Sequence, residues 1–69
     1  MDLTPIESEC LQATAHDAEA NIMQIQFASG DIYEYFNVPP EIHAGLREAP
    51  SAGRFFRENV RGQFAYRKL

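Results

Sequence analysis

The sequence predicts an α+β fold, in which an antiparallel three-stranded meander carries two short helices packed on one face and ends in a short C-terminal strand or tail. Two segments rich in β-branched and aromatic residues, 22–27 and 32–36, flank a Ser-Gly turn. Proline residues at 39 and 40 follow, and two stretches then space their apolar residues about one helical turn apart. Strands followed by helices along one chain are typical of α+β proteins.

The length of 69 residues predicts a single domain over 1–69 with a small core. Residues 2–9 hold Pro5 and three carboxylates, so we expect an exposed lead-in that is flexible over 1–8. The single cysteine, Cys10, has no partner for an internal disulfide. The first residues lack the features of a signal peptide, and no run approaches the roughly 18 apolar residues of a membrane span. We therefore expect a cytoplasmic protein without a membrane partner.

The first strand is expected at residues 10–15, followed by a polar turn over 16–21. The second strand, 22–27, alternates so that its apolar side chains on one face point to the core. These residues are Met23, Ile25 and Phe27.

The return strand, 32–36, has two possible registers. A two-residue turn would direct Glu34 to the core, whereas a type I turn with a bulge at Gly30 pairs Ile25 with Tyr33 and directs Tyr33 and Tyr35 inward. A slip of one residue exchanges the two faces of the strand. We favour the bulged register because a carboxylate is a poor core residue.

Two helices are expected next. The first runs over 40–48, where Gly45 weakens it, and Pro50 ends it. The second runs over 52–60, with Ser51 as its N-cap. Its apolar stripe falls at i, i+4 and i+8, and consists of Ala52, Phe56 and Val60. Gly62 stops the helix, and the alternating residues 63–69 form a closing edge strand or an extended tail.

Charge is divided unevenly along the chain. The net charge is −4, but residues 1–48 hold nine acids against one base, a net −8, and residues 49–69 hold five bases against one acid, a net +4. Such asymmetry is consistent with a basic binding face, and equally with attraction between the two halves within one chain or across a dimer. The five bases of the second half are Arg54, Arg57, Arg61, Arg67 and Lys68.

The Tyr33 and Tyr35 pair, the following Val38-Pro39-Pro40 and the later segment from Gly53 to Arg61 resemble the KTSC domain family. This family is found at the C-terminus of some lysyl-tRNA synthetases and as small stand-alone bacterial proteins. The family's central Tyr-x-Tyr pattern is matched by Tyr33 and Tyr35. Its later Gly, aromatic, Phe, Asn and Arg pattern, with an aromatic-x-Tyr ending, is matched by Gly53, Phe55, Phe56, Asn59, Arg61, Phe64 and Tyr66. The sequence departs from the family where Phe55 and Phe64 replace frequent tyrosines. The resemblance implies RNA binding only through the family's attachment to a tRNA-handling enzyme.

The residues point to a binding module and not to an enzyme. No nucleophile, acid–base pair, phosphate loop or metal-ligand spacing is present, so we expect no metal, cofactor or small-molecule substrate. Two hypotheses remain open. In the first, the domain binds nucleic acid, RNA more than DNA, through Arg54, Arg57, Arg61, Arg67 and Lys68 with stacking by Tyr33 or Tyr35. In the second, it is a protein-interaction or homodimerisation domain in which the same arginines meet the acidic first half of a partner copy. Whichever hypothesis holds, Tyr33 and Tyr35 are also candidates for the core or an interface.

Overall fold

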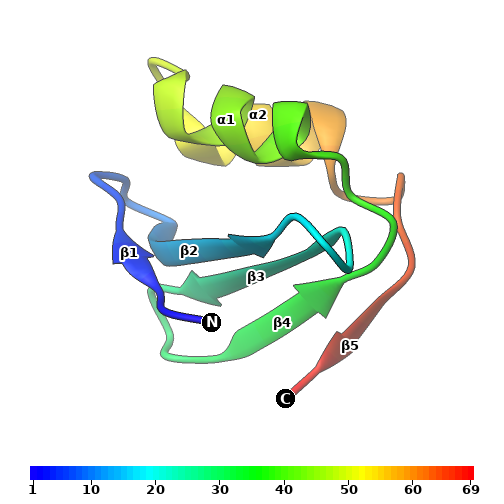
Figure 1. Cartoon of the computed structure of the whole chain (residues 1–69). Coiled ribbons are helices and arrows are strands. Elements are labelled where there is room, and N and C mark those ends of the chain that lie inside the picture. The colour runs from blue at the N-terminus through cyan, green and yellow to red at the C-terminus, as the bar shows by residue number, and fades with distance from the viewer.

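A computed structural model describes the whole chain, residues 1–69. An antiparallel sheet of five strands in the order β1-β2-β3-β4-β5 lies beneath two helices, which both cover the same face (Figure 1). Both termini lie on the side of the sheet away from the helices. The elements are β1 (Thr4–Pro5), β2 (Leu11–Asp17), β3 (Ile22–Phe27), β4 (Ile32–Tyr35), α1 (Pro40–Glu48), α2 (Ala52–Asn59) and β5 (Tyr66–Lys68).

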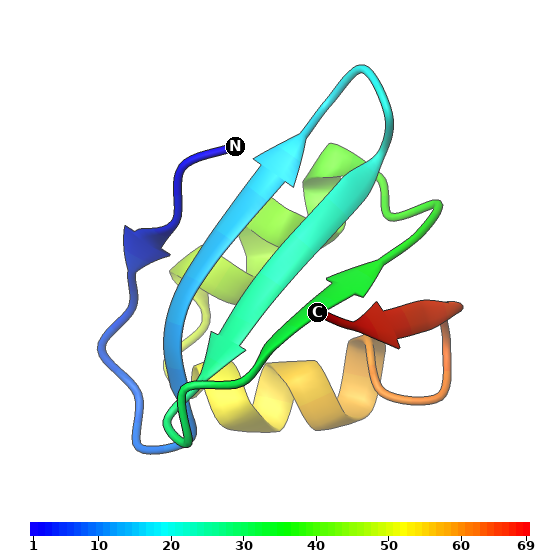
Figure 2. The same ribbon diagram turned by 90° about the horizontal axis from the view of Figure 1, so that it is seen from below.

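The sheet is wider than the predicted three-stranded meander, because short strands are added at both edges (Figure 2). At one edge β1 pairs with β2, with Thr4 opposite Thr14 and Pro5 opposite Ala13, so part of the expected lead-in is a strand. A proline is tolerated there because an edge strand leaves one row of N–H groups unused. At the other edge β5 pairs with β4, which confirms the strand alternative for the C-terminal segment. Two- and three-residue strands are too short to show a hydrophobic period.

Strand β2 runs two residues further than expected, into the predicted polar turn. His16 belongs to the strand, and its ring is held by a hydrogen bond of 2.7 Å between Nε2 and the carbonyl oxygen of Val38. The turn itself is built by Asp17, whose carboxylate accepts hydrogen bonds from the backbone N–H groups of Glu19 and Ala20. Asn21 completes the turn with a positive φ of 54°.

The hairpin between β3 and β4 takes the predicted bulged register. Ile25 lies opposite Tyr33 and Met23 lies opposite Tyr35, so both tyrosines point towards the helices. Gly30 adopts a φ of +96°, the left-handed conformation that this turn requires. Met23 and Ile25 are completely buried beneath the helices, as their position on this face predicts.

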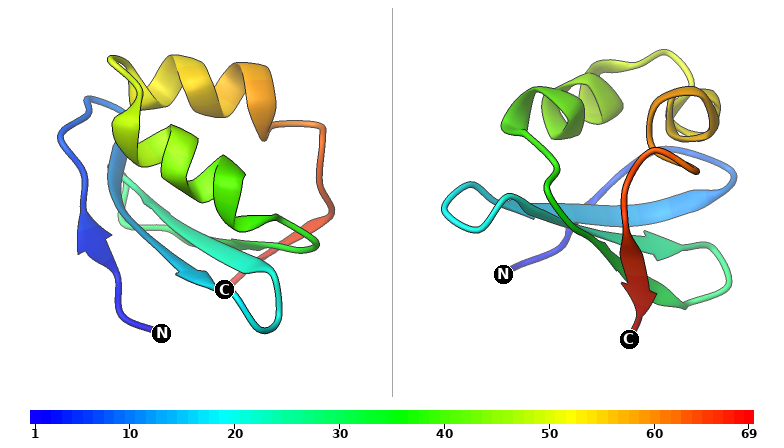
Figure 3. Two further views of the ribbon diagram at one scale, coloured as in Figure 1. Left: turned by 45° about the horizontal axis from the view of Figure 1, so that its top comes forward. Right: turned by 90° about the vertical axis from the view of Figure 1, so that its right-hand side faces the viewer.

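The helices begin and end close to the expected residues. Helix α1 buries Leu46 against the sheet, and α2 is capped by Ser51, whose hydroxyl accepts a hydrogen bond from the backbone of Arg54. Helix α2 ends at Asn59, one residue early, and Gly62 takes a positive φ in the following turn. The helices lie side by side across the sheet (Figure 3).

The core lies between the helix layer and the sheet and contains nine residues. It draws on every element except the two edge strands, and consists of Leu11, Met23, Ile25, Tyr35, Val38, Leu46, Ala52, Phe56 and Val60. Partly buried hydrophobic side chains pack against this core, and four of them are aromatic: Phe27, Tyr33, Phe55 and Phe64. Neither helix is long and apolar enough to cross a membrane.

Candidate functional site: an aromatic pocket beside Arg61

A pocket opens where the core reaches the surface, between the C-terminal end of α2 and the β4–β5 side of the sheet. Its volume is about 360 Å³, within the range of small-ligand sites in proteins. Five aromatic side chains and one arginine form most of its lining, and we call it the tyrosine pocket. Those residues are Phe27, Tyr33, Tyr35, Phe56, Tyr66 and Arg61.

The pairing of the strands gathers the three tyrosines. Tyr33 and Tyr35 are two residues apart in β4 and so share a face, and Tyr66 of β5 lies directly opposite Tyr35. The ring centre of Tyr66 is 5.7 Å from that of Tyr33 and 5.6 Å from that of Tyr35. Tyr35 is buried, Tyr33 is half-buried and Tyr66 is 60% exposed, so the tyrosines form a graded wall from the core to solvent.

Two phenylalanines hold this wall in place. Phe56 of α2 meets the rings of Phe27 and Tyr35 edge to face, with ring centres 5.4 and 5.7 Å apart. Phe27 of β3 also meets Tyr33 edge to face at 5.4 Å. Edge-to-face contacts of this kind stabilise a cluster beyond its buried area. The pocket is therefore preformed by packing on both the sheet and the helix side.

The pocket also contains polar groups. None of the three tyrosine hydroxyls makes a hydrogen bond within the chain. Burial raises the pKa of Tyr35 to about 12, with smaller contributions from Tyr33 and Tyr66, and the nearby positive charge of Arg61 acts in the opposite direction. The pocket thus presents phenol groups, the guanidinium of Arg61 and the acidic residue Asp31. Its aromatic rings suit a planar ligand.

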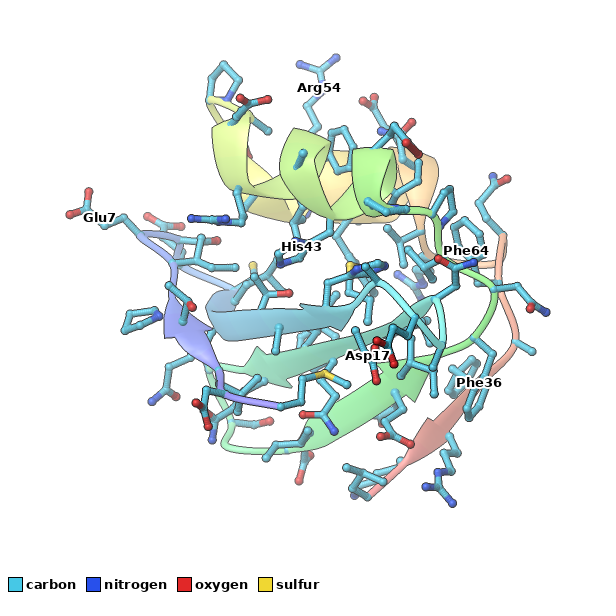
Figure 4. All side chains as sticks on the ribbon, in the orientation of Figure 1. Glu7, Asp17, Phe36, His43, Arg54 and Phe64 are labelled. Carbon is cyan, nitrogen blue, oxygen red and sulfur yellow. The ribbon has the colours of Figure 1, made fainter.

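Three of the five predicted binding bases are paired with acids of the same chain. Arg54 contacts Glu58 one turn along α2 at 3.2 Å, and Figure 4 shows Arg54 pointing away from the sheet. Lys68 lies 3.7 Å from the carboxylate of Asp31. These contacts are exposed and contribute little to stability, but they reduce the charge available to a ligand.

The third pair lies on the face of the sheet opposite the helices. There Glu34 accepts hydrogen bonds of 2.9 Å from both Gln24 and Arg67, so three neighbouring strands are linked. These two bonds and the charge of Arg67 lower the pKa of Glu34 below its ordinary value despite some burial. Glu34 is only 9% exposed although it is not in the helix-facing core. Arg67 is therefore directed away from the tyrosine pocket.

The remaining two predicted bases, Arg57 and Arg61, form no ion pair within the chain. Arg57 lines a separate depression near Cys10 and the start of α2, whereas Arg61 follows the end of α2 and lines the tyrosine pocket. The structure does not bring the five predicted bases onto one surface. It brings together Tyr33, Tyr35 and Arg61.

The residues that sequence reasoning did not assign to the site are Tyr66, Phe27, Phe56 and the turn residues Ser29, Asp31 and Gly62. The alternation of Phe64 and Tyr66 indicates a strand, but it does not show which strand this segment pairs with. Only the pairing of Tyr66 with Tyr35 places its ring in the pocket.

The fold and the pocket define a small α+β domain, with an antiparallel meander under two helices and a central Tyr-x-Tyr beside an arginine. The chain belongs to the KTSC domain family, whose model matches residues 7–64.

Relatives include parts of large proteins and small separate ones. The chain is 33% identical over 63 residues to a lysine–tRNA ligase of Nostoc punctiforme, and the match covers 91% of this chain but 11% of the ligase. It is 36% identical to a protein of Stutzerimonas stutzeri, with 91% of this chain and 89% of that protein covered. The crystal structure of a KTSC domain protein from Yersinia pestis superposes with a TM-score of 0.95 at 31% identity, covering 99% of this chain and 96% of that one.

Proposed function

We propose that this domain binds single-stranded nucleic acid, RNA in preference to DNA, by holding an unpaired base against the tyrosine pocket while Arg61 contacts a phosphate. The observation that carries the proposal is the meeting of three tyrosine rings with an arginine that has no acidic partner. Aromatic rings on a strand face stack unpaired bases, and guanidinium groups bind phosphates in pairs of hydrogen bonds.

Two further observations favour RNA. The tyrosine hydroxyls make no hydrogen bond within the chain and are suitable partners for the 2′-hydroxyl that distinguishes RNA from DNA. Some relatives bear the name lysine–tRNA ligase, and in them the matched part is joined to a longer chain. Joining to a larger protein would also compensate for low affinity, because a tethered module binds at a high effective concentration.

The charge of the domain predicts weak binding with a shallow salt dependence. The net charge is −4, and Arg61 is the only base lining the pocket. For one or two phosphate contacts, the slope of log affinity against log salt concentration is about −0.7 to −1.4 for a single strand. Most of the binding free energy must then come from stacking, which contributes about 1–3 kcal/mol per base.

The test is fluorescence anisotropy of a short labelled RNA, the matching single-stranded DNA and a DNA duplex at low salt. We expect the RNA to bind most tightly, Tyr66→Ala and Arg61→Ala each to weaken binding about tenfold or more, and Arg54→Ala to change it less than about twofold. Arg54 is the matched control, since it is exposed on α2, paired with Glu58 and directed away from the sheet.

Two outcomes would overturn the proposal. One is the absence of RNA binding up to about 1 mM protein, which corresponds to a binding free energy weaker than about −4 kcal/mol. The other is an equal effect of Arg54→Ala and Arg61→Ala, which would indicate general attraction to the surface and no role for the pocket.

A second candidate function is homodimerisation, and the edge strand β5 is the feature that favours it. This strand pairs on one side only, and Tyr66 within it and Leu69 just after it are 60% and 56% exposed. An open edge is a template for pairing with another chain. Sedimentation across a wide concentration range tests it, and a protein that stays monomeric throughout would exclude it.

A further inference from the structure

A carboxylate lies in the wall of the tyrosine pocket, and the nucleic-acid proposal alone does not explain it. Asp31, the residue before β4, lines the pocket together with Arg61. A negative charge at this position repels phosphate, so a simple anion site would not favour it. The two charged residues lie on different layers of the fold: Arg61 follows the end of α2, and Asp31 belongs to the hairpin turn between β3 and β4.

The position of Asp31 is fixed from several sides. Its backbone carbonyl accepts a 2.9 Å hydrogen bond from Phe27, which closes the bulged turn. Its carboxylate accepts a hydrogen bond of 3.3 Å from the hydroxyl of Ser29, and its other oxygen lies 3.7 Å from the ammonium group of Lys68. The side chain of Asp31 nevertheless remains 49% exposed.

This carboxylate has capacity for a ligand. An ionised carboxylate offers about four acceptor positions, and within the chain only one hydroxyl and one distant ammonium group use them. Among the side chains that line the pocket, it is the only one that accepts hydrogen bonds without donating any. A ligand edge that faces Asp31 must therefore present N–H donors.

The edges of the four bases differ in this respect. Guanine presents two adjacent donors, the N1–H and the N2 amino group, and these match the two oxygens of a carboxylate. Adenine and cytosine present one amino group beside an acceptor nitrogen, and uracil presents one N–H between two carbonyl oxygens. Only guanine meets a carboxylate with two donors and no opposed acceptor.

We infer that the tyrosine pocket selects guanine, with Asp31 accepting hydrogen bonds from N1–H and the N2 amino group while the base lies against the tyrosine rings. The inference rests on the proposed function and specifies its substrate. The phosphate lies at the Arg61 end of the pocket, and the base edge lies at the hairpin end. Ser29 and Lys68 hold the carboxylate in position when no ligand is bound.

The experiment compares labelled oligouridines that carry one central guanosine, inosine, adenosine or uridine. Inosine retains the N1–H of guanosine and lacks its N2 amino group. We expect the guanosine strand to bind about tenfold more tightly than the adenosine and uridine strands, and the inosine strand to be intermediate. Single guanosines in a uridine context avoid the stacked assemblies of guanine-rich strands.

The variant Asp31→Asn tests the assigned residue. We expect it to reduce guanosine binding to the level of adenosine and to leave adenosine binding nearly unchanged. The matched control is Asp17→Asn, which changes the net charge equally at the other hairpin turn and keeps the side-chain oxygen that accepts from Glu19 and Ala20. This control should retain the preference for guanosine. Circular dichroism confirms that both variants fold.

The outcomes separate the inference from the proposed function. Equal affinity for all four strands, with binding still lost in Tyr66→Ala, would overturn the guanine preference and leave the nucleic-acid site standing. A guanosine preference that survives Asp31→Asn would overturn the role of Asp31. Binding of none of the strands would overturn the proposed function itself.

Discussion

The glycine in the middle of α1 offers a sharp test of how the helix layer is packed. A Cβ atom built at Gly45 would lie 2.6 Å from Cζ and 2.9 Å from Cε2 of the Phe55 ring on α2. Carbon atoms in good contact are about 3.5–4.0 Å apart, so the ring and an alanine side chain cannot both keep their places. The sequence predicts that Gly45 weakens the helix, and the structure shows that the ring of Phe55 uses the space.

The substitution Gly45→Ala therefore has two opposing effects. Replacing glycine by alanine inside a helix favours folding by about 1 kcal/mol. Displacing the ring of Phe55 costs about 1–3 kcal/mol, the usual range for overpacking. We expect a net loss of about 1 kcal/mol in the free energy of unfolding, which lowers Tm by about 4–8 °C for a domain of this size.

The sign should reverse when the ring is removed. In a Phe55→Ala background, Gly45→Ala should stabilise the protein by about 1 kcal/mol, which makes the coupling between the two positions about 2 kcal/mol. Urea unfolding of the four proteins, followed by circular dichroism with a shared slope, measures this cycle. Gly53→Ala is the matched control, because its Cβ would meet its nearest neighbours at 3.6 and 3.7 Å, an ordinary contact. Equal stabilisation by Gly45→Ala in both backgrounds would refute the reasoning.

Two further predictions concern ionisation. Burial, and then the charges of His16 and Arg47, lower the pKa of His43 below 6.5, and its buried Nε2 has no hydrogen-bond partner. As the pH falls, the unfolded chain therefore takes up this proton before the folded protein does. The contribution of neutral His43 to the free energy of unfolding is complete above about pH 6.5 and is lost as the pH falls towards the pKa of His43 in the folded protein. Urea unfolding between about pH 7.5 and 5 should show a weaker dependence of stability on pH for His43→Phe, and an unchanged dependence would contradict the prediction. In a spectrophotometric titration of the folded protein, the last tyrosine to ionise should have a pKa of about 12, and this titration step should be missing in Tyr35→Phe. Ionisation of all three tyrosines together near pH 10 would exclude the buried environment assigned to Tyr35.

The central hairpin was predictable because its two registers differ strongly in energy. One register buries a carboxylate on the helix side, and the other buries tyrosines, so the sequence favours the observed pairing. Glu34 still becomes nearly inaccessible on the opposite face, where Gln24 and Arg67 cover it. Sequence reasoning could favour a register that keeps Glu34 out of the core, but it could not foresee partners from two neighbouring strands.

The edge strands and the ion pairs were not predictable in the same way. Strand β1 contains two exposed residues, and its existence depends on pairing with β2 and not on any pattern of its own. The contact between Arg67 and Glu34 spans 33 positions in the sequence. Charge counts indicate that the two halves attract each other, but only the register of β5 on β4 decides which arginine meets which acid. The same register decides that Tyr66, absent from the predicted site, completes the pocket.

The distribution of paired and unpaired bases determines what kind of binding is possible. An extended phosphate track needs several bases free on one surface, and its affinity falls by orders of magnitude over a modest rise in salt concentration. Here Arg54, Arg67 and Lys68 are engaged by acids of the chain, and Arg57 lies in a different depression from Arg61. With one guanidinium at the pocket, the proposed binding of nucleic acid relies mainly on the aromatic wall. Loss of a tyrosine ring should then weaken binding at every salt concentration, and loss of Arg61 should also reduce the salt slope by about 0.7.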